Sequence, residues 1–538
     1  MTPLKFAAAC IATILSASFL PTAAIAGAPF SMKNGYRSAF HIGAALDSRV
    51  FVNEDPVLSD IVTGQCSLIV AGNELKWESL HPAINRYDFS KADSFVNWGE
   101  RNGMQVHGHV LVWHSQTPAS AFKDASGRDV SRDVMIERMQ DHIRTVMGRY
   151  KGRIQTWDVV NEAFNDDGTM RDSPWSRIIG RDFIEIAFRT AREVDPSAML
   201  VYNDYSWVNP AKRAGILAHI RELLAKGVPI DALGIQGHWQ LGYPSIEQVD
   251  ATLWDLASTG LKILITELDI DVLPTAWDYT GADINVRFEL QDSLNPYRET
   301  IPPAVLQQQA DRYAALFTKF LEYKDFIHTV TFWGITDQDS WLNNFPVRGR
   351  TNYPMAYNRN NQPKPAYFAI MNVAPDPLVP AATSTDPYVP IPLHRFHRKS
   401  NNSHFFTVTQ AEFNALSADT SGTWVYEGPS HHVIGNHTQN STPVYRLFNR
   451  VSGSHFYTAT KEEMVGVLAD PSSIFNYEGI AFWVLLAPIP GAQPVYRFFA
   501  PPSGSHFFTI NEQEKDVLRA TVSPTQLSYD GVAWFAFP

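Results

Sequence analysis

Short apolar runs alternate with long amphipathic segments between residue 30 and about residue 372. Eight of the runs have the length and composition of buried strands, and longer stretches with helical spacing separate them. The expected strands are Phe40–Asp47, Ser67–Asn73, Gln105–Trp113, Ile154–Glu162, Met199–Asp204, Ala232–His238, Lys262–Asp269 and Val330–Asp337. The expected helices include Ser131–Tyr150, Asp182–Val194, Ala211–Lys226 and Val305–Tyr323.

Repeated strand–helix units predict an α/β fold with a parallel sheet, and eight such units between residues 30 and 372 fit a (β/α)8 TIM barrel. A doubly wound sheet is the alternative. That fold carries a G-x-G-x-x-G turn after a strand, and none of the eight runs is followed by one. The pattern therefore favours the barrel for residues 30–372.

The pattern changes after the barrel. Residues 373–388 are rich in Pro, Ala, Ser and Thr, which predicts a linker. Residues 389–538 then repeat with a period of 51 residues, seen in Arg395, Arg446 and Arg497 and again in His404, His455 and His506. Three copies of this length predict a smaller, β-rich, closed module with threefold pseudo-symmetry rather than an open solenoid.

Residues 1–26 have the features of a signal peptide. Lys5 precedes an apolar run, and Ala24-Ile25-Ala26 forms an A-x-A cleavage site before Gly27. A membrane anchor is the alternative, but the run is short and is interrupted by serines and a proline. Export and cleavage would remove Cys10 and leave Cys66 without an intrachain disulfide partner. We expect a secreted protein, either periplasmic or extracellular.

Composition narrows the classes of partner. The chain has 538 residues, too many for one core, with 45% hydrophobic and 18% charged residues, as in soluble globular proteins. Its net charge of -11 and the absence of a basic stripe argue against binding to nucleic acid. No segment beyond the N-terminal run is apolar enough to cross a membrane. We expect a monomer.

Polar residues of the barrel gather at the C-terminal ends of the expected strands. They are Asn73, Lys76, His107, His109, Trp113, His114, Asn161, Glu162, Asn203, Asp204, Gln236, His238, Glu267, Asp269, Trp333 and Asp337. Because a barrel brings its strand ends together around one mouth, we expect these side chains to share one site. Capping of the following helix would explain one or two such positions, but not seven strands.

Two carboxyl groups in this set suit the hydrolysis of a glycosidic bond. Glu162 ends the expected fourth strand and Glu267 lies in the seventh, so the two could face each other across the mouth. The reaction needs one protonated carboxyl at the leaving oxygen and one carboxylate at the anomeric carbon. A separation of about 5–5.5 Å between them would mean retention of configuration, and the sequence leaves that distance open.

Four motifs carry a resemblance to a known family. GHVLVWHSQ at residues 108–116, WDVVNEA around Glu162, ITELDI around Glu267 and FWGITDQDSW from residue 332 occur in this order. Together they resemble glycoside hydrolase family 10, the endo-β-1,4-xylanases, across the whole first domain. The later repeats are similar to an uncharacterised repeat of secreted bacterial enzymes.

The resemblance implies a role for each matching residue. Glu162 would be the acid/base and Glu267 the nucleophile of a retaining, endo-acting hydrolysis of xylan or xylo-oligosaccharides, without metal or cofactor. Asn161 would hold the 2-hydroxyl of the sugar at the cleavage point. His238 and Asp269 would keep the nucleophile ionised and oriented. The side chains that would bind the substrate are Asn73, Lys76, His109, Trp113, Gln236, Trp333 and Trp341.

Two features depart from the family pattern. Gly72 stands where the family usually has a Glu that binds a sugar one step further out, which weakens the expected grip on that sugar. Residues 279–303 form a long polar insertion after the seventh strand, which either reshapes the edge of the cleft or is an inert loop. We favour reshaping.

Other interpretations remain open at this point. His107 and His109, with His114, His238 and Asp337, resemble the ligands of a metal-dependent hydrolase. The chain could also be a hydrolase of another β-glycan or a non-catalytic polysaccharide binder. Trp333 and Trp341 could be packed core rather than walls of a sugar site. The repeated histidines of the C-terminal module are either core residues or part of a carbohydrate-binding surface.

Overall fold

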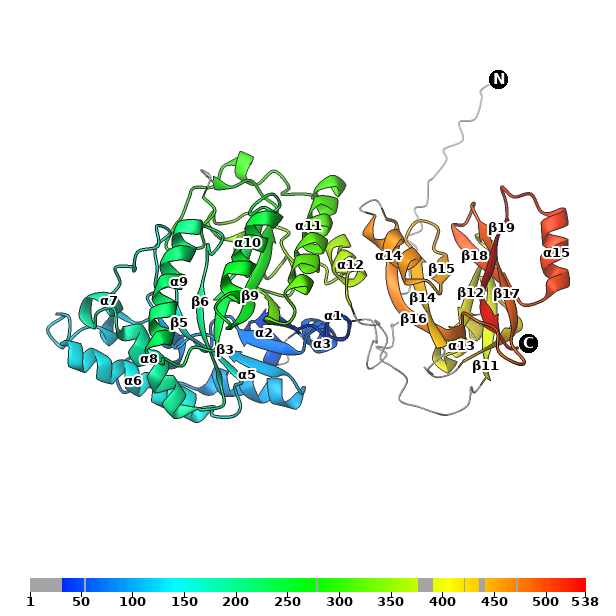
Figure 1. The fold of residues 1–538 in the computed structure, drawn as a ribbon. Helices are drawn as coiled ribbons and strands as arrows, with labels where there is room; N and C mark the ends of the chain where they lie inside the picture. The colour runs from blue at the N-terminus through cyan, green and yellow to red at the C-terminus, as the bar shows by residue number, and fades with distance from the viewer. Residues whose placement is uncertain are drawn as a thin grey trace, which may run out of the picture.

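The computed structural model describes residues 31–52, 55–276, 279–375, 390–419, 421–434, 441–470 and 473–538. The predicted signal peptide and most of the predicted linker lie outside these residues. Within them the chain forms a parallel barrel surrounded by helices and a separate antiparallel module (Figure 1). The predicted fold class is therefore confirmed. None of the described helices is long and apolar enough to span a membrane.

The barrel is closed. Among the described residues its strands pair in parallel in the order β10-β1-β2-β3-β5-β6-β7-β9, and β9 pairs back with β10. Their bounds are β1 (His41–Leu46), β2 (Leu68–Ala71), β3 (Gln105–Gly108), β5 (Thr156–Asn161), β6 (Met199–Asp204), β7 (Ala232–Ile235), β9 (Lys262–Asp271) and β10 (Ile327–Phe332). Two short strands, β4 (Val112–Trp113) and β8 (His238–Gln240), pair in parallel with the C-terminal ends of β5 and β9.

Helices cover the outside of the barrel (Figure 1). The longer ones are α3 (Pro56–Gln65), α5 (Ser90–Arg101), α6 (Arg132–Arg149), α8 (Phe183–Val194), α9 (Pro210–Ala225), α10 (Ile246–Ala257), α11 (Pro303–Glu322) and α12 (Pro365–Asn372). The shorter ones are α1 (Met32–Gly35), α2 (Ser48–Phe51), α4 (Trp77–Leu80) and α7 (Pro174–Ile178). Helix α6 shows why they form: the Ser131 hydroxyl caps its N-terminus, and Met135, Met139 and Ile143 bury one face at four-residue spacing.

Three expected strands differ from the observed ones by more than two residues at an end, and two of these differences arise at glycines. Gly237 has a φ of 82°, which interrupts the expected sixth strand between β7 and β8. Gly334 has a φ of 138°, and the eighth strand ends before it, at Phe332. The expected third strand divides into β3 and β4, between which the Leu111 N–H donates to the carbonyl of Asp158.

The C-terminal module is an antiparallel sheet structure. In its described residues the order strand, strand, helix, strand occurs three times, and the threefold pseudo-symmetry of the whole stays a prediction. The units are β11 (Pro390–Arg398), β12 (Ser403–Thr407), α13 (Gln410–Ser417), β13 (Trp424–Ile434); β14 (Ser441–Asn449), β15 (His455–Thr458), α14 (Lys461–Ala469), β16 (Phe475–Leu485); and β17 (Gln493–Ala500), β18 (Ser505–Thr509), α15 (Glu512–Thr521), β19 (Ser528–Ala536).

The repeated Arg and His of each unit converge on one carboxylate. Arg446 Nε lies 2.9 Å and His455 Nε2 lies 3.2 Å from Glu478 Oε2. The equivalent groups surround Glu427 in the first unit and Asp530 in the third. These side chains are mostly buried, so each repeated histidine lies beside an ion pair between the Arg and the carboxylate of its unit.

The module packs against the barrel through its middle unit. Helix α14 lies against α12, the last helix of the barrel. Apolar side chains of the middle unit, among them Met464 and Leu468, belong to the same hydrophobic cluster as Ile370 and Met371 of α12. The two domains therefore share a continuous apolar contact.

Candidate active site

The polar strand ends line one cleft of about 390 Å³ at the mouth of the barrel. The predicted site residues that line it are Asn73, Lys76, His109, Trp113, Asn161, Glu162, Gln236, His238, Glu267, Trp333 and Trp341. Asp269 lies next to them, hydrogen-bonded to His238 and Trp341. The structure thus brings all twelve predicted side chains together, from strands far apart in the sequence.

Glu162 follows directly after β5 and is held from several sides. Its backbone is left-handed, with a φ of 58°, and its N–H donates to the Asn203 carbonyl at 3.0 Å. The carboxyl group accepts from Trp113 Nε1 at 2.8 Å and from Gln236 Nε2 at 2.9 Å. Burial, with 4% of the residue exposed, raises the pKa of Glu162 to about 7, because these hydrogen bonds offset it only in part. This carboxyl group can therefore carry a proton at mildly acidic pH.

Glu267 is buried in β9 but has the opposite pKa shift. Its carboxylate accepts from Asn203 Nδ2 at 2.9 Å and lies 3.1 Å from His238 Nε2. Burial alone would raise the pKa of Glu267, but the hydrogen bond from His238 and the charges of His109 and His238 outweigh burial and lower it. Two neighbouring carboxyl groups with pKa values pushed apart are the arrangement that an acid and a nucleophile need.

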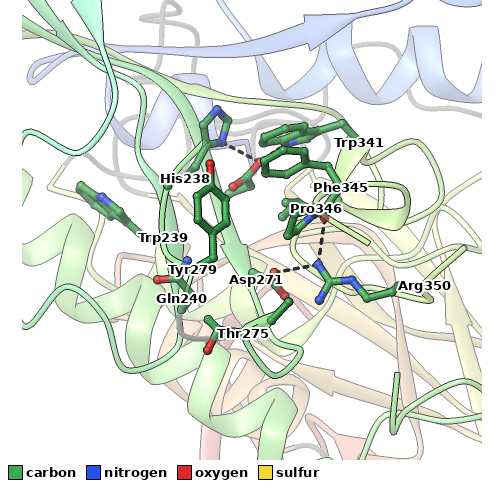
Figure 2. A pocket seen from close by; sticks show the side chains of 14 residues that line it. His238, Trp239, Gln240, Asp271, Thr275, Tyr279, Trp341, Phe345, Pro346 and Arg350 are labelled. Carbon is green, nitrogen blue, oxygen red and sulfur yellow. Dashed lines mark hydrogen bonds and ion pairs between the residues drawn. The ribbon is translucent and has the colours of Figure 1, made fainter. Parts of the chain in front are cut away.

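A chain of hydrogen bonds supports the nucleophile. His238 Nδ1 lies 3.0 Å from Asp269 Oδ2, which also accepts from Trp341 Nε1 at 2.8 Å. Burial would lower the pKa of His238, but the charge of Asp269 and the hydrogen bonds to both carboxylates raise it to about 10. His238 is therefore a cation beside Glu267. Figure 2 shows Trp341 and His238 side by side, with Tyr279 and Phe345 completing an adjoining pocket.

The remaining side chains of the cleft are of two kinds, polar groups and aromatic rings. Lys76 Nζ donates to Asn73 Oδ1 at 3.0 Å and to Gln116 Oε1 at 2.7 Å, and burial lowers its pKa to about 8. Trp333 meets His109 edge-on at 5.4 Å. Both Trp333 and Trp341 are partly exposed and line the cleft, so they are not packed core.

Residues 31–373 match the model of glycosyl hydrolase family 10, which is well over half of the chain. The chain belongs to this family. Family 10 relatives include endo-1,4-beta-xylanase A of Xylanibacter ruminicola, which is 41% identical over 359 residues covering 67% of this chain and 97% of the relative. The endo-1,4-beta-xylanase of Geobacillus stearothermophilus is 39% identical over 64% of this chain and 98% of its own length.

Two solved structures are similar to this chain in fold and in sequence. A GH10 endoxylanase from a sugarcane soil metagenome has a TM-score of 0.62 and 43% identity, covering 64% of this chain and 99% of that one. A structure described as a mutant in complex with xylotriose has a TM-score of 0.57, 35% identity, and covers 64% and 99% of the two chains. Residues 392–537 match a separate domain of unknown function, DUF5648.

Gly72 lines the edge of the family 10 cleft. A Cβ atom at this position would contact only the Leu46 carbonyl, at 3.3 Å. The nearby cleft residues Asp47 and Asp339 are both paired with Arg49. Gly72 thus places no acidic side chain beside this ion-pair cluster, at the position where the resemblance leads us to expect one.

The insertion after β9 borders the cleft. Its residues Ala282, Ile284 and Arg287 line the same cavity as the two glutamates. Phe288 further along packs with Ala276, Leu294 and Val347 in a small cluster of its own. The insertion is therefore part of the cleft wall and not an inert loop.

Three residues acquire roles that the sequence did not reveal. The sequence places Asn203 at the mouth but gives it no role. In the structure its backbone carbonyl accepts from the Glu162 N–H, and its side-chain amide donates to the Glu267 carboxylate. Asp158 lies 3.0 Å from His107 and 2.8 Å from His109 and orients both rings. Arg171 donates from Nε to the Glu162 carbonyl at 3.0 Å. The role of Asp158 could have been inferred from the sequence, because it is a charged residue within the apolar run of β5. Nothing in the sequence around Arg171 indicates its role.

Four of the five residues of the alternative metal site are paired with other side chains, while the fifth, His114, has its Nε2 4.0 Å from Glu162 Oε2. Asp337 is buried against Lys364, 3.1 Å away. His107 and His109 share Asp158, and His238 lies between Glu267 and Asp269. Among the described residues no group of three or more His, Cys, Asp and Glu side chains is arranged to hold a metal ion.

Proposed function

We propose that this chain is an endo-β-1,4-xylanase that hydrolyses xylan and xylo-oligosaccharides by a retaining double displacement. The observation that carries the proposal is the pair of buried glutamates in one family 10 cleft, with the pKa of Glu162 raised to about 7 and that of Glu267 lowered. Relatives that bear the name endo-1,4-beta-xylanase match this chain over nearly their whole length.

In the first step, Glu162 protonates the leaving oxygen while the Glu267 carboxylate attacks the anomeric carbon. The products are a covalent glycosyl ester on Glu267 and the released end of the chain. Ester formation removes the negative charge of Glu267, which lowers the pKa of Glu162. Glu162 can then take a proton from water, which attacks the anomeric carbon and frees Glu267 with retained configuration.

The remaining site residues bind the sugar and orient the groups that react. Asn161, whose amide donates to Glu162 Oε1 at 3.3 Å, would hold the 2-hydroxyl of the sugar at the cleavage point. His238 compensates the charge of Glu267 before and after the ester exists. Trp333 and Trp341 offer apolar faces to the C–H faces of the sugar rings.

Release of reducing sugar from xylan by the wild type, and by Glu267→Ala and Glu267→Gln, tests the proposal. We expect activity only in the wild type, with the first-formed product in the β configuration by NMR. An α product or full activity of both variants would contradict it. Mixed-linkage β-glucan as a parallel substrate separates xylan from other β-1,4-glycans.

We also propose that residues 1–26 are a signal peptide and that the mature protein is secreted as a monomer. The Lys5 start, the apolar run and the Ala24-Ile25-Ala26 site support export. Cell fractionation with N-terminal sequencing should find a mature chain that begins at Gly27, outside the cytoplasm. Sedimentation should give the mass of one chain.

For the C-terminal module we propose polysaccharide binding. Tyr426 in the first unit and Tyr529 in the third are 41% and 36% exposed, and such rings can stack on sugars. The inactive Glu267→Ala chain should be retained on insoluble xylan or cellulose. Combining it with Tyr426→Ala and Tyr529→Ala should weaken retention, while Val451→Ser, which alters an exposed residue of the middle unit, should not. No retention on any polysaccharide would reject the idea.

A further inference from the structure

Residues 279–288, here called the strap, cross the mouth of the barrel. The strap begins after β9 and reaches the loop that follows β5, where Asp283 lies 3.4 Å from Arg171. Asn285 Nδ2 then donates to Ser115 Oγ, beyond β4, at 3.5 Å. The Phe288 N–H finally donates to the Pro346 carbonyl, in the loop that follows β10, at 2.9 Å. The strap therefore contacts loops from both sides of the cleft.

Both ends of the strap are fixed on the same side of the mouth. The Tyr279 hydroxyl accepts from the Asp283 N–H at 3.0 Å, and its ring contacts Phe288 at 5.7 Å. Figure 2 shows the Tyr279 ring between His238 and Phe345. Arg287 lies over the Phe345 ring, 5.5 Å from its centre. Only the middle of the strap extends across the cleft, so its position depends on what holds the tip.

Asp283 is the latch at that tip. Its partner Arg171 also donates to the Glu162 carbonyl at 3.0 Å and to the Tyr205 hydroxyl at 2.6 Å. The side chains of Arg171 and Asp283 are only 14% and 26% exposed, so solvent screens their attraction less than that of a surface pair. The strap is thus tied to the backbone of the acid/base residue.

The space beneath the strap is the catalytic cleft. Ala282, Ile284 and Arg287 face the same cavity as Glu162 and Glu267. That cavity, about 390 Å³, lies in the lower part of the range for small-molecule pockets, although the intended substrate is a polymer. A polysaccharide bound at Glu162 and Glu267 would therefore lie against the strap at its scissile bond.

We propose that the strap selects substrates: an unsubstituted stretch of xylan passes beneath it, whereas side groups on the sugars at the scissile bond are excluded while Asp283 holds Arg171. This inference rests on the proposed xylanase function and adds the part of the chain that determines tolerance of decorations. The strap acts by steric exclusion, so it affects the choice among xylans and not the chemistry at Glu162 and Glu267.

Asp283→Asn tests the latch, because it keeps the size of the side chain and removes the charge. We compare kcat/KM for an arabinose-substituted xylan with kcat/KM for linear xylohexaose. Release of the strap should raise the ratio about fivefold, the effect of losing a partly buried ion pair. Asn285→Ala should change the ratio in the same direction by less. Asp292→Asn is the matched control, because this carboxylate of the same insertion is 99% exposed and pairs with Arg298.

An unchanged ratio in an active Asp283→Asn enzyme would overturn the strap proposal alone. An equal fall of both kcat/KM values would also overturn it, since the ion pair would then only position the acid/base. Failure of the wild type to hydrolyse xylohexaose would refute the proposed function, and the strap proposal with it.

Discussion

Removal of the indole donor of Trp113 should shift the pH dependence of hydrolysis. Trp113 Nε1 donates to Glu162 Oε2 at 2.8 Å, and a donor to the charged form of a carboxyl group lowers its pKa. Trp113→Phe keeps an aromatic ring in the cleft but loses this donor. The pKa of Glu162, about 7 in the wild type, should therefore rise.

The size of the shift follows from the hydrogen bond. A hydrogen bond to a charged group contributes about 1.5–3 kcal/mol, and one pKa unit corresponds to about 1.4 kcal/mol. The pKa of Glu162 should thus rise by about 1–2 units. The alkaline limb of the kcat/KM profile reports the acid group of the free enzyme, so it should move to higher pH by the same amount.

The assay is kcat/KM for xylotriose between acidic and alkaline pH, with Trp341→Phe as control. Trp341 also lines the cleft and also donates to a carboxylate, but that carboxylate is Asp269. Trp341→Phe should therefore leave the alkaline limb in place. An alkaline limb that stays fixed in Trp113→Phe, or moves to lower pH, would refute the assignment of this limb to Glu162.

Three further outcomes are expected. Glu162→Ala should reduce activity on xylan far more than on an aryl glycoside with a good leaving group, because only the former needs the acid; equal losses would count against the role of Glu162. His238→Gln should raise the pKa of Glu267 and so move the acidic limb of kcat/KM to higher pH, and an unmoved limb would contradict the role of His238. The pKa of Glu162 is higher in the folded state than in the unfolded state, so its contribution to the free energy of unfolding is fully present below about pH 4.5 and falls by about 3 kcal/mol as the pH rises through about 7. Denaturant unfolding measured at low and at high pH should therefore show a smaller loss of stability in Glu162→Gln than in the wild type.

The barrel and its site were largely predictable because both depend on short-range patterns. Each strand is an apolar run, and the polar residue that ends it must lie at the mouth once the barrel closes. Glu162 and Glu267 were identified by this reasoning before any distance was known. The expected strands run through Gly237 and Gly334, whereas the positive φ values of these glycines interrupt or end the strands in the structure.

Other parts of the site depend on contacts between distant segments. Arg171 reaches the Glu162 carbonyl and Asp283, 112 positions away, and nothing in the local sequence of either residue indicates this pairing. The direction of each pKa shift was equally hidden, because Glu162 and Glu267 are both buried and differ in their neighbours. The sequence also left open whether the insertion borders the cleft, which depends on how the tip of the strap is held.

The contact between α12 and α14 has a consequence for how the enzyme meets its substrate. If the C-terminal module were joined to the barrel by the linker alone, the barrel could reorient over the substrate surface within a distance set by the length of the linker. Here the shared apolar cluster fixes the orientation of the catalytic mouth relative to the exposed faces of the first and third units of the module. If those faces bind a polysaccharide fibre, this fixed orientation determines which polysaccharide chains the catalytic mouth can reach. To reach other glycosidic bonds, the whole enzyme would then have to dissociate from the fibre and bind it again.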